Sequence, residues 1–481
     1  MVFSDLFFLF VFIPAFAICY MLAAIVDRWL SSSTARRMIL KNIVIVIFSL
    51  IFYGWGEPIY VFLMILCVFL NYLSGLGIDR FEGKRRKLML ILGLIANLSI
   101  LGTFKYAGFF AQTLCDIGLN VSVPQIALPI GISFYTFQSI SYLIDVYRKQ
   151  SPAQHHFGNL LLYISMFPQL VAGPIVRYDT IAREINDRKI SAEDIAEGLF
   201  RFLIGLGKKV IIANQFSEIA DQFLAGNLSN LSTAGAWIGT FAYALQIYFD
   251  FAGYSDMAIG MGRCMGFHFN ENFNHPYISR SITEFWRRWH ISLGSFFRDY
   301  LYIPLGGNRN HQTLNILIVW ILTGLWHGAS WNFVLWGLYF GVLLLVEKYV
   351  ILRFVDKLPR ILTHLYALAL IMFSWGLFYF DNLTSIGTFY TTLFGQSGAA
   401  ADISVENALL NNFWLWVVAI IFCMPTRQFI TDLTARLLAK NQGVLTFVNI
   451  STRTIVSLAI LILSVALLVG ATNNAFIYTR F

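Results

Sequence analysis

Long apolar runs separated by short polar segments dominate this chain. A helix needs about 20 apolar residues to cross the hydrocarbon core of a bilayer, and the sequence contains about twelve candidate spans. They cover residues 3–25, 39–55, 58–75, 88–104, 128–146, 199–213, 236–260, 312–328, 331–350, 362–380, 411–425 and 454–472. The pattern predicts an all-α polytopic membrane protein, organised as a single membrane-embedded domain over residues 1–481. We expect the first run to be a retained span, because neither a basic segment nor a small-residue cleavage site marks it as a signal peptide.

Two stretches depart from this pattern. Residues 157–175 are apolar, yet both flanks are basic, and Pro168, Gly173 and Pro174 interrupt a helix. A bent or re-entrant segment is expected there, and such backbone at membrane depth must be buried in protein or line a wet cavity. Residues 276–309 are too charged to span and too aromatic for a plain loop. They predict an amphipathic or re-entrant helix on the cytoplasmic side.

Composition agrees with a membrane protein. The chain is 58% apolar and only 12% charged, whereas soluble domains carry about 25% charged residues. The formal net charge of +8 is spread between the apolar runs instead of gathered in one patch, so we expect no nucleic-acid partner. The five cysteines include no C-x-x-C pair and the histidines show no metal-ligand spacing, so neither a disulfide framework nor a metal site is predicted.

The basic residues alternate between the two ends of the predicted spans. If the N-terminus is outside, all of the 34 Lys and Arg except Lys105 and Arg480 fall on the inner side. The outer segments 214–235 and 381–410 contain none. Cytoplasmic segments of membrane proteins carry such an excess of Lys and Arg. The distribution therefore predicts that both termini lie outside, with the lipid bilayer as the first partner.

The first candidate site surrounds His327, at the end of one apolar run. An imidazole with an ordinary pKa of about 6.5 can take a proton near neutrality, which a hydroxyl must lose as it attacks an acyl carbonyl. Trp326 can form a wall of such a site, and Asn332 can orient a hydrogen bond. The alternative is an interfacial histidine between belt tryptophans, which the local sequence favours equally.

A second cluster contains His290 and Trp289 among arginines. Arg287, Arg288 and Arg298 are suited to capturing phosphate or carboxylate groups, because guanidinium forms paired hydrogen bonds with both. A basic cytoplasmic mouth could hold the phosphates of an acyl donor. Anchoring to anionic lipid head groups explains the same residues, and the local sequence favours that simpler role.

A third cluster lies inside the predicted span 236–260, where Asp250 and Asp256 are six residues apart. Helical geometry places the two carboxylates far apart around the axis, so they form a poor acid–base pair for one substrate. Carboxylates at membrane depth need partners. We therefore expect ion pairs with inner arginines, or a place on the wall of a wet tunnel.

Taken together, several runs resemble the membrane-bound O-acyltransferase family. They are EFWRRWHISLGSFFRDYLYIPLGG at 284–307, LTGLWHGASWNFVLWG at 322–337, YFDFAGYS at 248–255 and, for the bacterial branch, FPQLVAGPIVRY at 167–178. The opening MVFSDLFFLFVF and the closing FIYTRF resemble the members of that branch that serve alginate O-acetylation. The resemblance implies a bundle of about 11–13 helices with re-entrant segments and a central tunnel.

The resemblance also implies roles. His327 would be essential for acyl transfer, and His290 would lie on the cytoplasmic side of the path. An acetyl group would pass from a cytoplasmic donor, acetyl-CoA or an acyl carrier, across the bacterial inner membrane. Secreted or membrane-anchored acetyltransferases would then place it on the polysaccharide, without a bound cofactor or metal in this chain. The residues expected along the donor path are Trp326, Asn332, Trp289, Arg287, Arg288, Arg298 and Asp250.

Other acceptors and one other class of protein remain open at this point. The acceptor could be peptidoglycan or cellulose, or the reaction could be D-alanylation of a teichoic acid. A transporter would also explain polar residues in spans and broken helices. The chain shows no inverted pair of interrupted spans, however, and the segment 284–309 is unlike a substrate gate.

Overall fold

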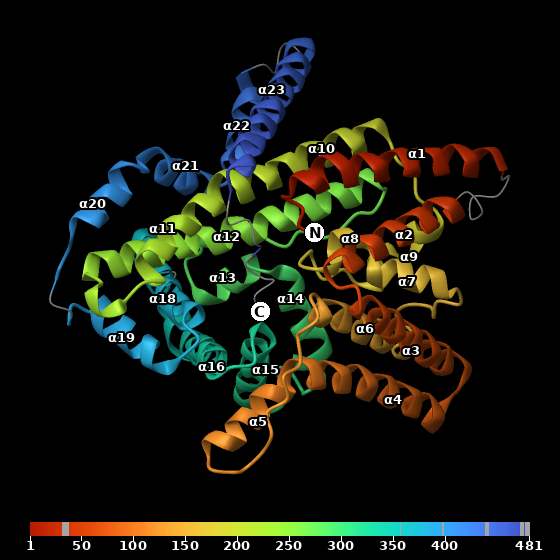
Figure 1. Ribbon diagram of the computed structural model, residues 1–481, viewed down its shortest axis with the longest axis horizontal. Coiled ribbons are helices and arrows are strands. Elements are labelled where there is room, and N and C mark those ends of the chain that lie inside the picture. Colours follow the sequence, from red (N-terminus) through yellow and green to blue (C-terminus); the bar gives the residue numbers. More distant parts are fainter. Residues whose placement is uncertain (31–37, 356, 397–398, 438–441, 472–475, 477–481) are drawn as a thin grey trace.

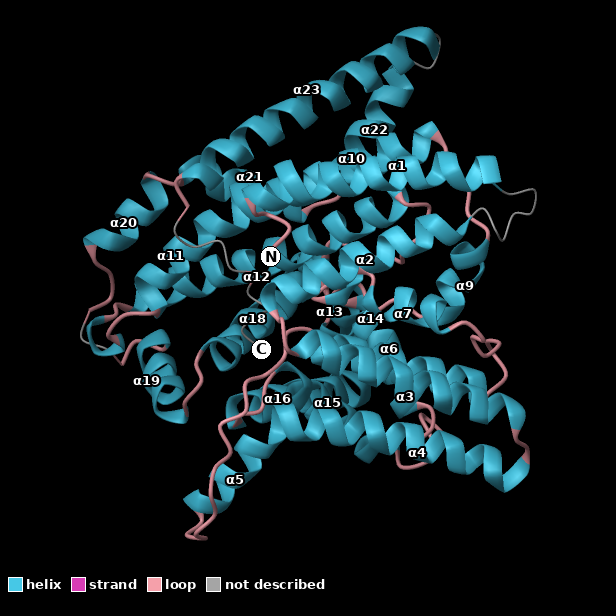
Figure 2. Cartoon of the chain, turned by 45° about the vertical axis from the view of Figure 1, so that its right-hand side comes forward, coloured by secondary structure: helices cyan, strands magenta, loops and turns pink. Residues whose placement is uncertain are grey.

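Helices form the whole of the described fold. The computed structural model describes residues 1–30, 38–355, 357–396, 399–437, 442–471 and 476, and no strand occurs among them (Figures 1 and 2). Within these residues, 7 helices are long and apolar enough to cross a membrane, or 8 if the bent pair α20 (Ile403–Leu410) and α21 (Phe413–Cys423) forms one span. This confirms an all-α polytopic membrane protein.

The first helices expose much of their apolar surface. They are η1 (Phe8–Phe12), α1 (Ile13–Leu30), α2 (Ile39–Gly56), α3 (Tyr60–Arg80) and α4 (Gly83–Leu101). Side chains such as Ile18 and Phe62 are more than half exposed, which suits contact with lipid tails. The π-helical turn η3 (Gly102–Tyr106) joins α4 to α5 (Ala107–Asp116), and α6 (Ile132–Tyr147) packs on α3 and α4.

The centre of the molecule is the long helix α12 (Thr233–Cys264), which runs beside α10 (Ala192–Gly207) in Figure 1. Glycines bring the two backbones together. A Cβ atom on Gly205 would lie 2.5 Å from the carbonyl oxygen of Gly253, and one on Gly198 would lie 2.6 Å from that of Gly260. Small residues permit such close helix packing inside a membrane protein. The π-helical η4 (Lys208–Ala213) then leads from α10 into α11 (Asn214–Leu224).

Ion pairs fasten the same helices. The Lys209 ammonium lies 2.8 Å from the Asp250 carboxylate, and both side chains are buried. Asp256 pairs with Arg201 at 2.8 Å and with Lys208 at 2.6 Å. The expected pairing of both aspartates is therefore present, although the partner of Asp250 is a lysine. Because each carboxylate is paired with its own cations, Asp250 and Asp256 do not form an acid–base pair with each other.

The apolar stretch 157–175 is bent and buried in protein, as expected. It forms α7 (Phe157–Ser165) and α8 (Phe167–Leu170), with a break at Met166 where ψ is 115°. The Phe167 N–H at the start of α8 donates to the Ser49 hydroxyl of α2 at 3.1 Å. That bond satisfies a backbone group for which lipid would offer no partner. The short helix α9 (Tyr178–Asn186) follows.

An amphipathic or re-entrant helix was expected within 276–309, and no single helix spans that stretch. The structure has four short pieces there: η6 (Pro276–Ile278), α13 (Ile282–Arg288), α14 (Ile291–Phe297) and η7 (Arg298–Tyr302). The aromatic side chains of this stretch pack inside the protein instead of lying on a membrane surface, and Trp289, Phe296 and Phe297 are buried. Alternating aromatic and basic residues are compatible with a helix on the membrane surface and with short pieces packed inside the protein. The sequence pattern therefore does not distinguish the two arrangements.

The remaining helices complete the bundle. α15 (Gln312–His327) and α16 (Trp331–Val346) pack as neighbours, and η8 (Glu347–Ile351) and α17 (Leu352–Val355) extend α16. They are followed by α18 (Arg360–Tyr379), α19 (Leu383–Leu393), α22 (Thr426–Leu437) and α23 (Gln442–Val469), the last two standing out at one edge in Figure 1. The helix that contains the predicted span 454–472 begins earlier, at Gln442, and its Arg453 pairs with Glu197 of α10. The end of the predicted span lies outside the described residues.

Candidate active site

His327 is the last residue of α15. The chain then becomes extended at Gly328, where φ is −168°, and α16 begins at Trp331. A Cβ atom on Gly328 would lie 2.1 Å from the ring of Phe333, so only glycine lets the two helix ends meet this closely. The sharp connection fixes the position of the His327 imidazole against the start of α16.

His290 lies in the break between α13 and α14, with φ at 44° in the left-handed region. Non-glycine residues rarely adopt this conformation and do so often at functional sites. Its Nδ1 lies 3.1 Å from Oδ1 of Asn272. That oxygen also accepts hydrogen bonds from the Ser292 N–H at 3.2 Å and the Ser292 hydroxyl at 2.9 Å. Because Oδ1 is an acceptor, Nδ1 carries the imidazole proton, and the lone pair lies on Nε2.

Trp326 brings the two histidines together. Its ring centre lies 5.7 Å from that of His290 and 4.7 Å from that of His327. The indole therefore contacts two imidazoles, one at the end of α15 and one in the break between α13 and α14. Both histidines are buried, with 1% of His290 and 3% of His327 exposed.

The walls around these imidazoles are aromatic. The rings of Trp336 on α16 and Phe378 on α18 lie 5.0 and 5.1 Å from His327. Phe251 on α12 lies 4.6 Å from His290. Surroundings of this kind exclude water and strengthen electrostatic interactions. A proton transfer at either imidazole would thus take place in a dry, preorganised site.

Three of the predicted path residues have packing contacts that account for their burial. The Asn332 amide donates to the Leu377 carbonyl at 3.3 Å and accepts from Ser330, which ties α16 to α18. Trp289 lies in a cluster with Phe273 and Trp375, at 5.2 and 5.3 Å. The Asp250 carboxylate faces Lys209, while the next residue, Phe251, contacts His290. Their roles along a donor path stay predictions.

The three predicted arginines differ in their surroundings. Arg288 pairs with Glu284 at 2.9 Å and Arg298 pairs with Asp299 at 2.7 Å, whereas Arg287 is exposed and pairs with no carboxylate of the described chain. Burial works to raise the pKa of the Asp299 carboxyl, but hydrogen bonds from Arg298 and Arg177 outweigh it and hold that pKa below its ordinary value. Of these three arginines, Arg287 is therefore the one whose guanidinium is most available to bind an anionic ligand.

Comparison with known proteins decides the class. Residues 148–389, which include both histidines, match the membrane-bound O-acyltransferase family. This chain belongs to that family. It is 42% identical over 407 residues to the probable alginate O-acetylase AlgI of Pseudomonas aeruginosa, covering 82% of this chain and 75% of that protein. The corresponding protein of Azotobacter vinelandii is 43% identical over 406 residues, covering 82% and 78%.

A second kind of relative is the peptidoglycan O-acetyltransferase of Helicobacter pylori, 35% identical over 422 residues and covering 80% of each chain. Membership of the family makes this protein a membrane acyltransferase. The alternative of a transporter therefore loses its support. The named relatives act on different polymers, so the acceptor does not follow from membership alone.

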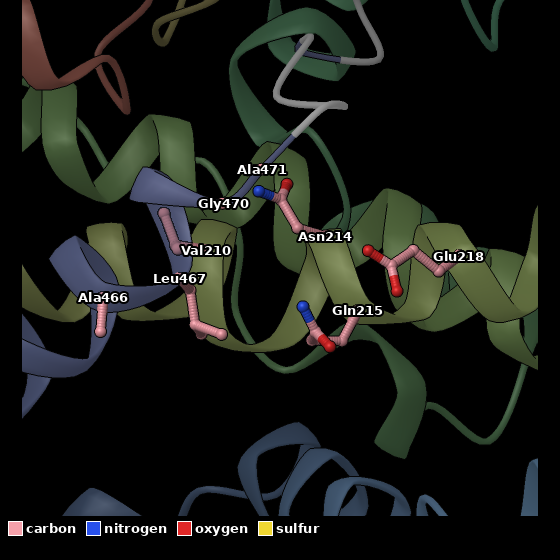
Figure 3. Close-up of a pocket in the computed structure, with 8 residues that line it drawn as sticks. All are labelled: Val210, Asn214, Gln215, Glu218, Ala466, Leu467, Gly470 and Ala471. Carbon is pink, nitrogen blue, oxygen red and sulfur yellow. The ribbon is translucent and has the colours of Figure 1, made fainter.

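A cavity of about 270 Å³ lies elsewhere, between η4, α11 and the end of α23 (Figure 3). Its only charged lining residue is Glu218, and neither histidine reaches it. A negatively charged wall without a cation is a poor site for the phosphates of an acyl donor. Its lining residues are Val210, Asn214, Gln215, Glu218, Ala466, Leu467, Gly470 and Ala471.

Sequence reasoning missed two residues at this acyltransferase site. Asn272 orients His290, but an asparagine in a polar connecting segment carries no signal that would single it out. Arg177 reaches Asp299 at 2.5 Å, and it lies inside the quoted run 167–178, where its basic side chain beside a broken apolar segment was such a signal. Of the closing run FIYTRF, only Phe476 lies within the described residues.

Proposed function

We propose that this acyltransferase moves an acetyl group from a cytoplasmic donor across the bacterial inner membrane, for O-acetylation of exported alginate. The single observation that carries the proposal is the contact of both His290 and His327 with the ring of Trp326. The names of the two AlgI relatives, at 42% and 43% identity, support the acetyl group and the polymer. The distribution of Lys and Arg supports a topology with both termini outside.

In this proposal the donor thioester, acetyl-CoA or an acyl carrier, approaches from the side of Arg287 and its acyl group reaches His327. An acceptor hydroxyl attacks the acyl carbonyl, and the His327 imidazole takes the hydroxyl proton. The C–S bond breaks as the new C–O bond forms, and the leaving thiolate takes a proton, so the imidazole returns to its starting state. In a second route the imidazole attacks the thioester, the C–S bond breaks and the thiol leaves; the hydroxyl then attacks the acyl-imidazole, forming the C–O bond and releasing the imidazole.

Secreted or membrane-anchored acetyltransferases complete the proposed pathway as partners, since a polymer outside the membrane must receive the group there. Acetylation of peptidoglycan is the second candidate, favoured by the 35% identity to the Helicobacter pylori enzyme. The two differ in acceptor only, so the same site serves both.

The test is complementation of an alginate-exporting bacterium that lacks its own membrane O-acyltransferase. Wild-type protein restores acetyl esters on the exported alginate, and His327→Ala restores none, although it inserts in the membrane in equal amount. The matched control is His155→Ala, which changes an exposed histidine and leaves acetylation intact. Unchanged alginate acetylation by His327→Ala overturns the site, and acetyl esters found only on muropeptides overturn alginate as the acceptor.

A further inference from the structure

Lys105 is an unusual residue in this membrane protein. It lies in the π-helical turn η3 between α4 and α5 and is buried, with 8% exposed. It is also one of only two basic residues that the predicted topology leaves on the outer side. A buried cation at membrane depth is costly and therefore calls for a function. Lys105 precedes the stretch 148–389 that matches the family.

The contacts of η3 converge on the end of α15. The Lys105 ammonium donates to the backbone carbonyl of Trp326 and to the Ser133 hydroxyl, the latter at 3.4 Å. The next residue, Tyr106, donates its hydroxyl to the carbonyl of Leu325 at 2.9 Å. Two successive side chains thus bind two successive carbonyls in the last turn of the helix that ends at His327.

These carbonyls need partners. The last four C=O groups of an α-helix have no partner within the helix, and lipid supplies none. The C-terminal end of a helix also carries partial negative charge, which a cation stabilises. No carboxylate of the described residues pairs with Lys105, so the helix end is its counter-charge. The ammonium also lies 6.0 Å from the centre of the Trp326 ring, the ring that contacts both histidines.

We propose that Lys105 is a positioning residue for His327: through the carbonyl of Trp326 it fixes the last turn of α15 and with it the imidazole. The inference rests on the acyl-transfer function proposed above. Tyr106 makes a second hydrogen bond, without a charge, to the carbonyl of Leu325. We call these two hydrogen bonds, from Lys105 and Tyr106 to the end of α15, the clamp. The π-helical turn explains how adjacent residues reach one helix end, and such turns are frequent at functional sites.

The test compares Lys105→Met, Lys105→Arg and Tyr106→Phe in the purified enzyme, with Lys84→Met as the control. Lys84 is an exposed lysine near the start of the same helix α4. A misplacement of about 1 Å can lower turnover about 100-fold. We expect Lys105→Met to lower kcat by about 10- to 100-fold while KM for the acyl donor stays within about twofold, because the donor binds at the arginine side. Lys105→Arg, which keeps the charge and donors, recovers part of kcat, and Lys84→Met matches wild type.

Several results would overturn the clamp. One is a wild-type kcat for Lys105→Met while His327→Ala is inactive, which refutes the clamp and leaves the proposed function standing. Another is equal loss in Lys105→Met and Lys105→Arg with a normal unfolding temperature. If Lys105→Met does not fold, Tyr106→Phe decides: a lowered kcat at unchanged KM supports the clamp, and an unchanged kcat refutes it. Full activity of His327→Ala refutes the proposed function itself.

Discussion

The close contact of α15 with α16 makes Gly324 the most sensitive glycine near the site. In Gly324→Ala the new methyl carbon would lie 2.1 Å from the carbonyl oxygen of Phe333. That is more than an ångström short of 3.4 Å, where ordinary contact begins. The clashing atom belongs to backbone, so no side-chain rotation relieves it. The helices must move apart by about 1 Å.

Two opposing effects set the magnitude. An alanine in a helix is favoured over glycine by about 0.5–1 kcal/mol, while overpacking of this kind costs about 1–3 kcal/mol. The clash exceeds the gain, so Gly324→Ala should be destabilised. His327 lies three residues further on, and a shift of about 1 Å there should lower turnover about 100-fold.

The assay measures unfolding temperature and kcat for the purified enzyme and a graded set of variants. Gly337→Ala places its methyl carbon 2.3 Å from the Trp320 carbonyl oxygen and should resemble Gly324→Ala, whereas Gly341→Ala meets the side chain of Leu317 at 3.2 Å and should be milder. Gly387→Ala, in α19, meets nothing within 4 Å and serves as the control. Equal stability and turnover for Gly324→Ala and Gly387→Ala would refute the reasoning.

Two further predictions concern residues that orient or neutralise groups beside the site. Asn272→Leu removes the acceptor of the His290 Nδ1 proton and should lower kcat at least about tenfold, as expected when a proton-transfer group is misoriented; Asn272→Asp keeps an acceptor and should lose less, and equal losses would contradict the assigned proton. Lys209→Met leaves the buried Asp250 without its cation and should cost about 3–5 kcal/mol of stability. The double variant Lys209→Met/Asp250→Leu should recover most of the lost stability in thermal unfolding. A double variant less stable than Lys209→Met alone would contradict this prediction.

The alternation of apolar and polar segments was sufficient to predict the helical bundle, although it gave about twelve spans where 7 or 8 helices of the described residues are long and apolar enough to cross a membrane. Membrane spans follow from local composition, because each helix must satisfy its own backbone in lipid. His327 stands out in the same way, since it ends an apolar run between two glycines, but the local sequence favours an interfacial histidine equally. The bent stretch 157–175 was predictable from its prolines and its basic flanks.

The partners within the site were not predictable, because they depend on contacts between distant segments. Nothing local shows that His290 and His327 share Trp326, or that Asn272 holds the proton of His290 on Nδ1. The division of the stretch 276–309 into short buried pieces was not predictable for the same reason, since aromatic residues that pack inside a protein look like those at a membrane surface. Lys105 was visible as an exception to the charge distribution, yet only the structure shows which carbonyl it binds.

The central claim is that acyl transfer at His327 moves an acetyl group from the cytoplasmic side of the membrane to the other side. The most direct test uses inside-out membrane vesicles from alginate-producing cells, with labelled acetyl donor added to the cytoplasmic face only. The account predicts that label accumulates on the polymer or acetyltransferase enclosed in the lumen with wild-type protein, and that none does so with His327→Ala. Label that reaches the lumen equally in the variant, or that stays on an acceptor on the donor side, would contradict it.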